Sequence, residues 1–214
     1  MERNRRTLAD LLDALVEVGG AHAVFGGLAA GCHGAERATA DIDLLAPAAC
    51  IQDVQAGLDR RGYRVRTFPH LTKLYLPGDP HPVADLLASE TNPAVRAAFT
   101  AREPAVILGL AVSVVKRGAF VALKFEAATG RRQPKDRARD VADIRAVLEK
   151  AFGPEDEHLA AEIASEMYAG AAQDLASLIQ DIRRGRPPRV ALRAARRSAL
   201  LLRQGRLAAH RART

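Results

Sequence analysis

The sequence has few aromatic residues and no tryptophan, since Phe, Tyr and Trp together make up 4% of its 214 residues. The apolar residues, 48% of the chain, must therefore build a core mainly from alanine and leucine, which favours helices. This composition is typical of a packed globule, long enough for one sizeable core with a helical appendage. The scarcity of aromatics also leaves few side chains that could stack on nucleic-acid bases.

Cysteines and long apolar runs are also scarce. Cys32 and Cys50 are the two cysteines, and we expect them to be reduced thiols in a reducing compartment. A zinc site would need more cysteines or histidines at ligand spacing. No apolar run approaches the roughly 20 residues of a membrane span, and the N-terminal segment has the pattern of an amphipathic helix rather than a signal peptide. We therefore expect a cytoplasmic protein without membrane contact.

Acidic residues are absent from the end of the chain. None follows Asp181, whereas eleven arginines lie between Arg183 and Arg213. Residues 1–181 hold the other 21 of the 32 basic residues and all 25 acidic ones, a net charge of −4. The basic tail predicts a polyanionic partner, with RNA, DNA and an acidic protein as alternatives, beside the simpler interpretation of a solvated helix face.

The apolar pattern predicts alternating helices and short strands. Helical spacing occurs in four segments, residues 8–18, 48–61, 118–128 and 140–150. Another helix is expected to begin near Leu28, directly after Gly26-Gly27. Strand-like patterns occupy residues 21–25, 38–45, 63–68, 71–76, 82–87 and much of 106–115. The PGDP turn at 77–80 predicts that its two flanking strands are antiparallel, and residues 130–139 predict a polar loop.

These elements predict an α/β (α+β) fold, with a short mixed sheet flanked by helices, for residues 1–150. Pro154 begins a helical segment over 155–182, and the GRPPR sequence at 185–189 interrupts it before a last helix over 190–210. We therefore expect residues 151–214 to form a helical, arginine-rich C-terminal extension.

The main chemical signal is a Gly-Gly turn followed by aspartates on predicted strands. Gly26 and Gly27 precede Asp41 and Asp43, and Asp85 follows on a later strand. Aspartates at i and i+2 of a strand project from one face, and carboxylate oxygens are the ligands that Mg²⁺ accepts. A third carboxylate on a neighbouring strand would complete a two-metal site for phosphoryl chemistry. Glycines without a Cβ let the backbone approach a phosphate closely.

Residues 26–45, GGLAAGCHGAERATADIDLL, resemble the signature of the nucleotidyltransferase superfamily of the minimal, DNA-polymerase-β-like type. Together with the later Leu-Lys of VALKFEA and the Arg-Asp-x-x-Asp of ARDVAD, they resemble the AbiEii-type toxin nucleotidyltransferases of bacterial toxin–antitoxin pairs. The resemblance covers roughly residues 20–150, and the extension after residue 150 departs from it.

The resemblance implies an enzyme that transfers a nucleoside monophosphate from an NTP such as ATP to RNA, notably the tRNA 3′ end, and that has an antitoxin partner. It implies two Mg²⁺ ions, or Mn²⁺, held by the three aspartates, and it adds Lys124 and Asp140 to the catalytic residues. Nucleotide-binding residues would be Gly26, Gly27, Arg37, Thr39 and Lys124. Arg37 and Thr39 lie shortly before the aspartates, where a guanidinium could bind phosphate through two hydrogen bonds.

Simpler interpretations accompany these roles. Lys124 could extend along a helix face toward water, Asp140 could cap a helix or pair with Arg139 or Arg145, and Asp85 could face solvent on a hairpin. At the level of function, two other classes stay open. One is an enzyme that modifies a small molecule such as an antibiotic, and the other is a non-catalytic nucleotide- or RNA-binding module. The sequence does not identify the NTP, the acceptor or the oligomeric state.

Overall fold

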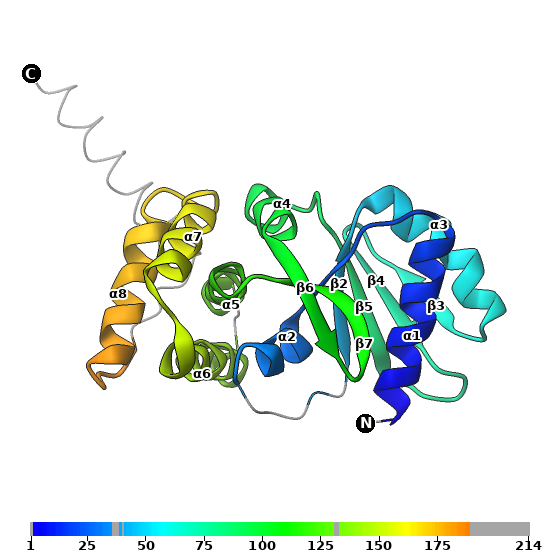
Figure 1. The fold of residues 1–214 in the computed structure, drawn as a ribbon, viewed down its shortest axis with the longest axis horizontal. Helices are drawn as coiled ribbons and strands as arrows, with labels where there is room; N and C mark the ends of the chain where they lie inside the picture. Colours follow the sequence, from blue (N-terminus) through cyan, green and yellow to red (C-terminus); the bar gives the residue numbers. More distant parts are fainter. Residues whose placement is uncertain (1, 36–38, 40, 131–132, 189–214) are drawn as a thin grey trace, which may run out of the picture.

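The computed structural model of the chain describes residues 2–35, 39, 41–130 and 133–188 (Figure 1). The helices of this part are α1 (Glu2–Glu17), α2 (Gly26–Cys32), α3 (Ala48–Arg60), α4 (Pro93–Thr100), α5 (Arg117–Gly130), α6 (Pro134–Ala151), α7 (Pro154–Ser165) and α8 (Ala171–Arg183). The strands are β1 (Ala23–Phe25), β2 (Ile42–Ala46), β3 (Arg64–Thr67), β4 (Leu71–Tyr75), β5 (Pro82–Ala88), β6 (Arg102–Ile107) and β7 (Leu110–Val115).

All seven strands belong to one mixed sheet, in the order β3-β4-β5-β2-β1-β7-β6. The β2–β5 and β1–β7 pairs are parallel, and the other four pairs are antiparallel. The predicted antiparallel pairing on either side of the PGDP turn is confirmed by β4 and β5. The α/β class with a short mixed sheet flanked by helices is confirmed as well.

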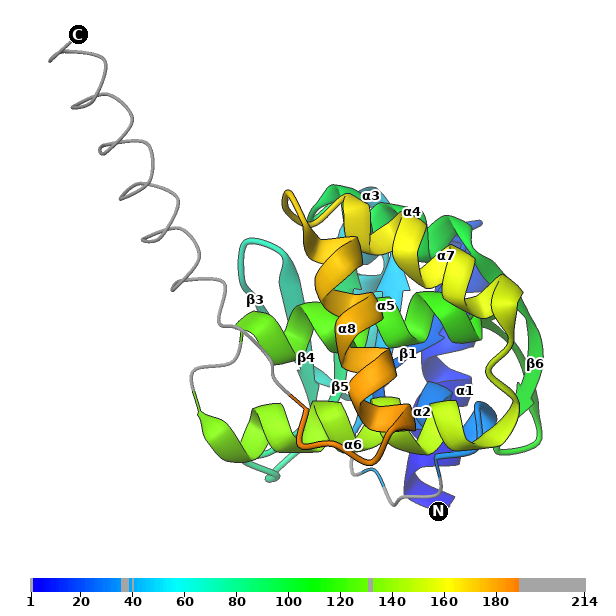
Figure 2. The same cartoon turned by 90° about the vertical axis from the view of Figure 1, so that its left-hand side faces the viewer.

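The helices form layers on both faces of the sheet. Figure 1 shows α1 and α3 on one face and α2 and α5 on the other, with α7 and α8 lying beyond α5. Turning the molecule by 90° places α8 in front of α5, with α6 beneath them (Figure 2). The amphipathic α1 buries Leu8, Leu11 and Leu15 completely, so it covers the sheet with one apolar stripe.

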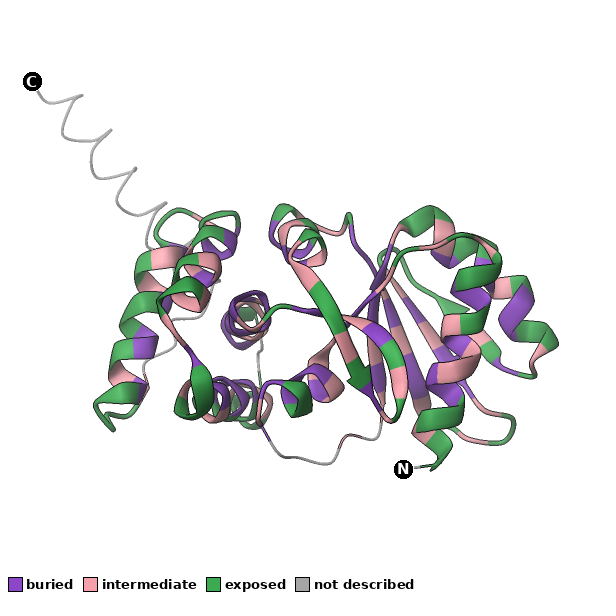
Figure 3. Cartoon of the chain, viewed as in Figure 1, coloured by how far each residue is buried: buried purple, intermediate pink, exposed green. Residues whose placement is uncertain are grey.

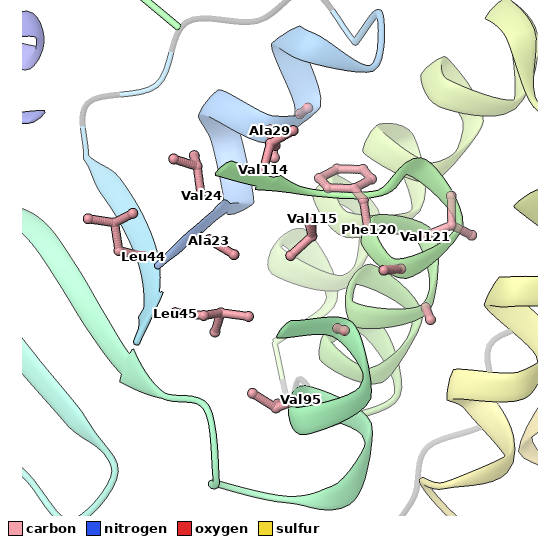
Figure 4. Packing of buried hydrophobic residues seen from close by; sticks show 14 of the residues in the cluster. Ala23, Val24, Ala29, Leu44, Leu45, Val95, Val114, Val115, Phe120 and Val121 are labelled. Atoms are coloured by element: carbon pink, nitrogen blue, oxygen red, sulfur yellow. The ribbon is translucent and has the colours of Figure 1, made fainter. Parts of the chain in front are cut away.

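Helix α5 is the central helix and is buried on most of its surface (Figure 3). Phe120 and Val121 join the strand residues Val24, Leu44 and Val114 in one hydrophobic cluster (Figure 4). A Cβ at Gly118 would overlap the carbonyl oxygen of Asp156, so glycine lets α5 and α7 approach closely. The buried residues of α7 and α8 belong to the same cluster, and the division at residue 150 stays a prediction.

Several predicted boundaries were wrong. The polar loop over 130–139 is helical from Pro134 onward, because proline suits the first helical turn and Asp136 lies in that turn. The single helical segment over 155–182 consists of α7, which ends at Ser165, and α8, which begins at Ala171 after Gly170 with a φ of +87. The predicted strand 38–45 begins only at Ile42, so Asp41 precedes it. The predicted helix over 190–210 lies outside the described residues.

No helix in the described ranges is long and apolar enough to cross a membrane.

Candidate active site

Two carboxylates lie opposite each other at the centre of the sheet. Strands β2 and β5 are parallel neighbours, and their register places Asp43 beside Asp85. On β2, Ile42 and Leu44 are fully buried while Asp43 is partly exposed. Because residues in register project from the same face of a sheet, both carboxylates emerge from the face that α2 adjoins.

The Gly-Gly turn lies directly against Asp43. Helix α2 begins at Gly26, whose φ of +62 belongs to the left-handed region that favours glycine. A Cβ at Gly26 would overlap the carboxylate oxygen Oδ2 of Asp43. The backbone N–H of Gly27 donates to that same oxygen at 3.4 Å. Close packing of the turn on the carboxylate therefore requires glycine at position 26.

Asp41 is held by Thr39, which lies two positions earlier in the chain. The Thr39 hydroxyl donates to Asp41 Oδ1 at 2.9 Å and is also 3.1 Å from the Asp41 carbonyl oxygen. Asn4 of α1 donates to the Thr39 carbonyl at 3.1 Å. Because Asp41 precedes β2, the predicted i, i+2 strand geometry does not position it, and the Thr39 hydrogen bonds do so instead.

The three carboxylates interact electrostatically. The pKa of Asp43 is raised from 3.8 to about 6, first by burial and then by the negative charges of Asp41 and Asp85. The Gly27 hydrogen bond and the positive charge of Lys124 lower the same pKa, but they do not cancel the increase. Burial and the neighbouring carboxylates therefore make the charged form of Asp43 unfavourable.

Lys73 forms an ion pair with the third carboxylate, a contact that the sequence analysis missed. Its Nζ lies 2.9 Å from Oδ1 and 2.6 Å from Oδ2 of Asp85. Lys73 belongs to β4, whose antiparallel register with β5 places it opposite Asp85. The PGDP turn predicted that β4 and β5 pair, but only the register identifies the partner of Asp85.

Lys124 joins two helices through buried ion pairs. It extends from α5, and its Nζ lies 3.1 Å from Asp140 Oδ1 and 2.7 Å from Asp143 Oδ2, both on α6. Asp140 and Asp143 are each only 3% exposed. The sequence analysis selected Asp140 but missed Asp143, although the spacing of three residues would place both on one helix face.

The structure thus brings together most of the residues selected from the sequence: Gly26, Gly27, Thr39, Asp41, Asp43 and Asp85. Lys124 is close enough to lower the pKa of Asp43. Asp140 pairs with Lys124 and lies inside α6 rather than at its start, so it does not cap that helix. Arg37 lies outside the described residues.

Among the described residues, no group of three or more His, Cys, Asp or Glu side chains is arranged to hold a metal ion. The chemistry of the site nevertheless fits a divalent cation. Carboxylate oxygens are the ligands that Mg²⁺ prefers, and a cation would favour the charged form of Asp43, which burial and the charges of Asp41 and Asp85 disfavour.

No protein-family model and no curated protein matches the sequence. Two solved structures of the antibiotic-resistance factor ANT(2'')-Ia are similar to it. The solution structure has a TM-score of 0.54 and 21% identity, covering 77% of this chain and 94% of that chain. The crystal structure in complex with adenylyl-2''-tobramycin has a TM-score of 0.56 and 19% identity, covering 77% and 98%. The chain therefore has the nucleotidyltransferase fold that its sequence predicts, and closeness to AbiEii-type toxins stays a prediction.

Proposed function

We propose that this chain is a metal-dependent nucleotidyltransferase, which moves a nucleoside monophosphate from an NTP to an acceptor hydroxyl. The observation that carries the proposal is the placement of Asp43 and Asp85 on neighbouring parallel strands, beside a glycine turn that packs on Asp43. The similarity of the fold to ANT(2'')-Ia supports the same proposal, because both proteins have a mixed sheet flanked by helices.

In this proposal Asp41, Asp43 and Asp85 hold Mg²⁺, or Mn²⁺ in its place. Bound Mg²⁺ would neutralise phosphate charge and lower the pKa of a hydroxyl beside it. The Gly26-Gly27 backbone would lie against the triphosphate, because no Cβ separates it from the ligand. Lys124 and Arg37, with Thr39, would complete the nucleotide site, and Asp140 would hold Lys124 in position.

The transfer step forms one bond and breaks one. The acceptor oxygen attacks the α-phosphorus, and the bond from that phosphorus to the bridging oxygen of the β-phosphate breaks. Pyrophosphate leaves with the bonding electrons. The hydroxyl proton passes to a carboxylate, either Asp85 or Asp43, before it is released to water.

Two acceptor classes have specific support. An RNA acceptor, notably the tRNA 3′ end, follows from the sequence resemblance to toxin nucleotidyltransferases and from the arginines of residues 183–213; an antitoxin partner belongs to the same proposal. A small hydroxyl compound follows from the fold likeness to ANT(2'')-Ia, whose crystal structure holds adenylyl-2''-tobramycin.

A labelling experiment tests the proposal. The full chain is incubated with Mg²⁺, each α-labelled NTP in turn, and either bacterial RNA or a pool of small metabolites and antibiotics. Label should enter one acceptor pool with the wild type and should be absent with Asp43→Asn and Asp85→Asn. Metal-independent nucleotide binding without transfer would instead favour a non-catalytic binding module.

A further inference from the structure

A row of charged side chains crosses four neighbouring strands. Strand register places Arg66 of β3 opposite Lys73 of β4, Lys73 opposite Asp85 of β5, and Asp85 opposite Asp43 of β2. Residues in register share a face of the sheet, so all four side chains emerge on the face of the candidate active site. Along this row the charge changes from negative at the centre of the sheet to positive at its β3 edge.

The basic end of the row is rigidly supported. Arg64 and Arg66 are both exposed, and their guanidinium carbons lie 4.9 and 5.4 Å from the ring centroid of Tyr75. The Tyr75 ring is buried, so it provides a fixed platform for two cations. Arg64 also donates to the carbonyl oxygen of Asp79 at 3.5 Å. Within the part of the chain that the structure describes, neither guanidinium forms an ion pair with a carboxylate.

The arginines and the glycine turn flank the carboxylates from opposite sides. Gly26 directly follows β1, which pairs with one edge of β2, while β5, β4 and β3 follow in order from its other edge. If the triphosphate lies against the turn, the acceptor hydroxyl must approach from the Asp85 side, where Lys73 and then Arg66 follow along the row. Strand β3, which carries Arg64 and Arg66, lies two strand spacings of about 4.8 Å each from Asp85, so an acceptor on this side lies near both guanidiniums.

We propose that Arg64 and Arg66 bind a phosphate group of the acceptor, so that this site selects an anionic, phosphate-bearing acceptor. The inference rests on the proposed nucleotidyl transfer and adds the chemical class of the second substrate. A planar guanidinium donates two parallel hydrogen bonds to a phosphate. A polycationic acceptor such as an aminoglycoside would be repelled by both arginines, so the fold likeness to ANT(2'')-Ia does not extend to its acceptor. Two sources of the phosphate share this chemistry: a nucleic-acid backbone and a phosphorylated small molecule.

The test compares the double variant Arg64→Glu/Arg66→Glu with a control of equal charge change, Arg96→Glu/Arg145→Glu. Both control residues are exposed on helices α4 and α6, away from the charged row. Fluorescence anisotropy with a labelled single-stranded RNA and calorimetry with ribose 5-phosphate measure acceptor binding, and tobramycin serves as the cationic probe. Label transfer from α-labelled NTP and equilibrium binding of Mn²⁺–NTP are measured in parallel, with thermal unfolding as the check on folding.

We expect one phosphate-bearing probe to bind the wild type and tobramycin not to bind. If RNA is the ligand, its binding constant should fall steeply with salt. The slope of log K against log salt concentration should be about −0.7 for each phosphate contacted. The Arg64→Glu/Arg66→Glu variant should bind that probe roughly tenfold or more weakly, and its affinity for Mn²⁺–NTP should be unchanged. The control variant should bind the probe within about twofold of the wild type. If the glutamates destabilise β3, Arg64→Gln/Arg66→Gln should show the same loss in a folded protein.

The outcomes separate this inference from the proposed function. Transfer with equal kcat/KM for both double variants, or transfer to tobramycin, would overturn the inference and leave nucleotidyl transfer intact. If the Arg64→Glu/Arg66→Glu variant loses probe binding but the wild type transfers label to no acceptor, the phosphate site is supported and the transferase is contradicted. If neither phosphate-bearing probe binds the wild type, the inference is wrong.

Discussion

Asp43 and Asp85 lie directly opposite each other on neighbouring parallel strands, although 42 positions separate them in the sequence. Burial and the charges of Asp41 and Asp85 raise the pKa of Asp43 to about 6. Lys73 pairs with Asp85, but the charged form of Asp43 stays unfavourable in its buried position unless a proton or a cation neutralises it. In the proposed function this cost in stability is offset by a bound cation, and the predictions below separate activity from stability.

Replacement of Asp43 with asparagine should reduce activity and raise stability. Transfer should fall by roughly a thousandfold, equivalent to about 4 kcal/mol, because a metal ligand is lost. In metal-free buffer at neutral pH the melting temperature should rise, because a repelled carboxylate is removed. Asp53→Asn, at an exposed position of α3, is the matched control and should change neither quantity. A variant with lower stability and full activity would contradict the assignment.

Stability of the metal-free protein should depend on pH through Asp43. Its folded-state pKa is about 6 and its unfolded-state value is 3.8, so the folded state binds more protons between these values. The contribution of this group is complete below 3.8 and is lost as the pH rises through about 6. Denaturation in EDTA at several pH values should show a decrease over this window that is smaller in Asp43→Asn. Equal pH profiles for the two proteins would show that the carboxylate is not perturbed.

Gly26→Ala should disrupt the site, whereas Gly31→Ala should not. A Cβ at Gly26 would overlap Asp43, and its φ of +62 is unfavourable for alanine, so we expect a loss of about 1–3 kcal/mol in stability. Affinity for metal and nucleotide should fall as well. Gly31 lies in the same helix with open space around its Cβ position, and alanine there should be neutral or stabilising by up to about 1 kcal/mol. Chemical denaturation and Mn²⁺ titration measure both effects, and similar behaviour of the two variants would refute the packing argument.

Lys124→Met should destabilise the protein by about 3–5 kcal/mol, because it removes a cation that pairs with two buried carboxylates. The triple variant Lys124→Met/Asp140→Asn/Asp143→Asn should be more stable than Lys124→Met, since it also removes the two buried carboxylates with which Lys124 pairs. Urea denaturation of both variants provides the comparison. If Lys124→Met unfolds like the wild type, the ion pairs contribute no stability and the lysine serves the nucleotide alone.

The sequence predicts much of the fold but only some of the contacts in the site. Apolar periodicity identifies the α/β class, because helices such as α1 and strands such as β5 bury one face each. The Gly-Gly turn and the aspartates are recognisable because close backbone packing and carboxylate chemistry limit the residue types at those positions. Helix ends are less certain, as Pro134 illustrates: proline permits a first helical turn as readily as a loop.

The missed residues are those whose partners depend on tertiary register. Lys73 is one basic residue in a short strand, and only the pairing of β4 with β5 places it on Asp85. Asp143 shares a helix face with Asp140, but its role depends on Lys124 of another helix. Contacts of this kind are set by how elements pack, which local patterns in one sequence do not encode.

The most direct test of the central claim compares α-labelled and γ-labelled NTP in otherwise identical reactions with Mg²⁺ and acceptor. Nucleotidyl transfer predicts that the α-label enters the acceptor and the γ-label leaves in pyrophosphate, and that Asp43→Asn abolishes both. The γ-label in the acceptor would identify phosphoryl transfer instead. Both labels in free phosphate or nucleotide products, with none in any acceptor, would contradict a transferase.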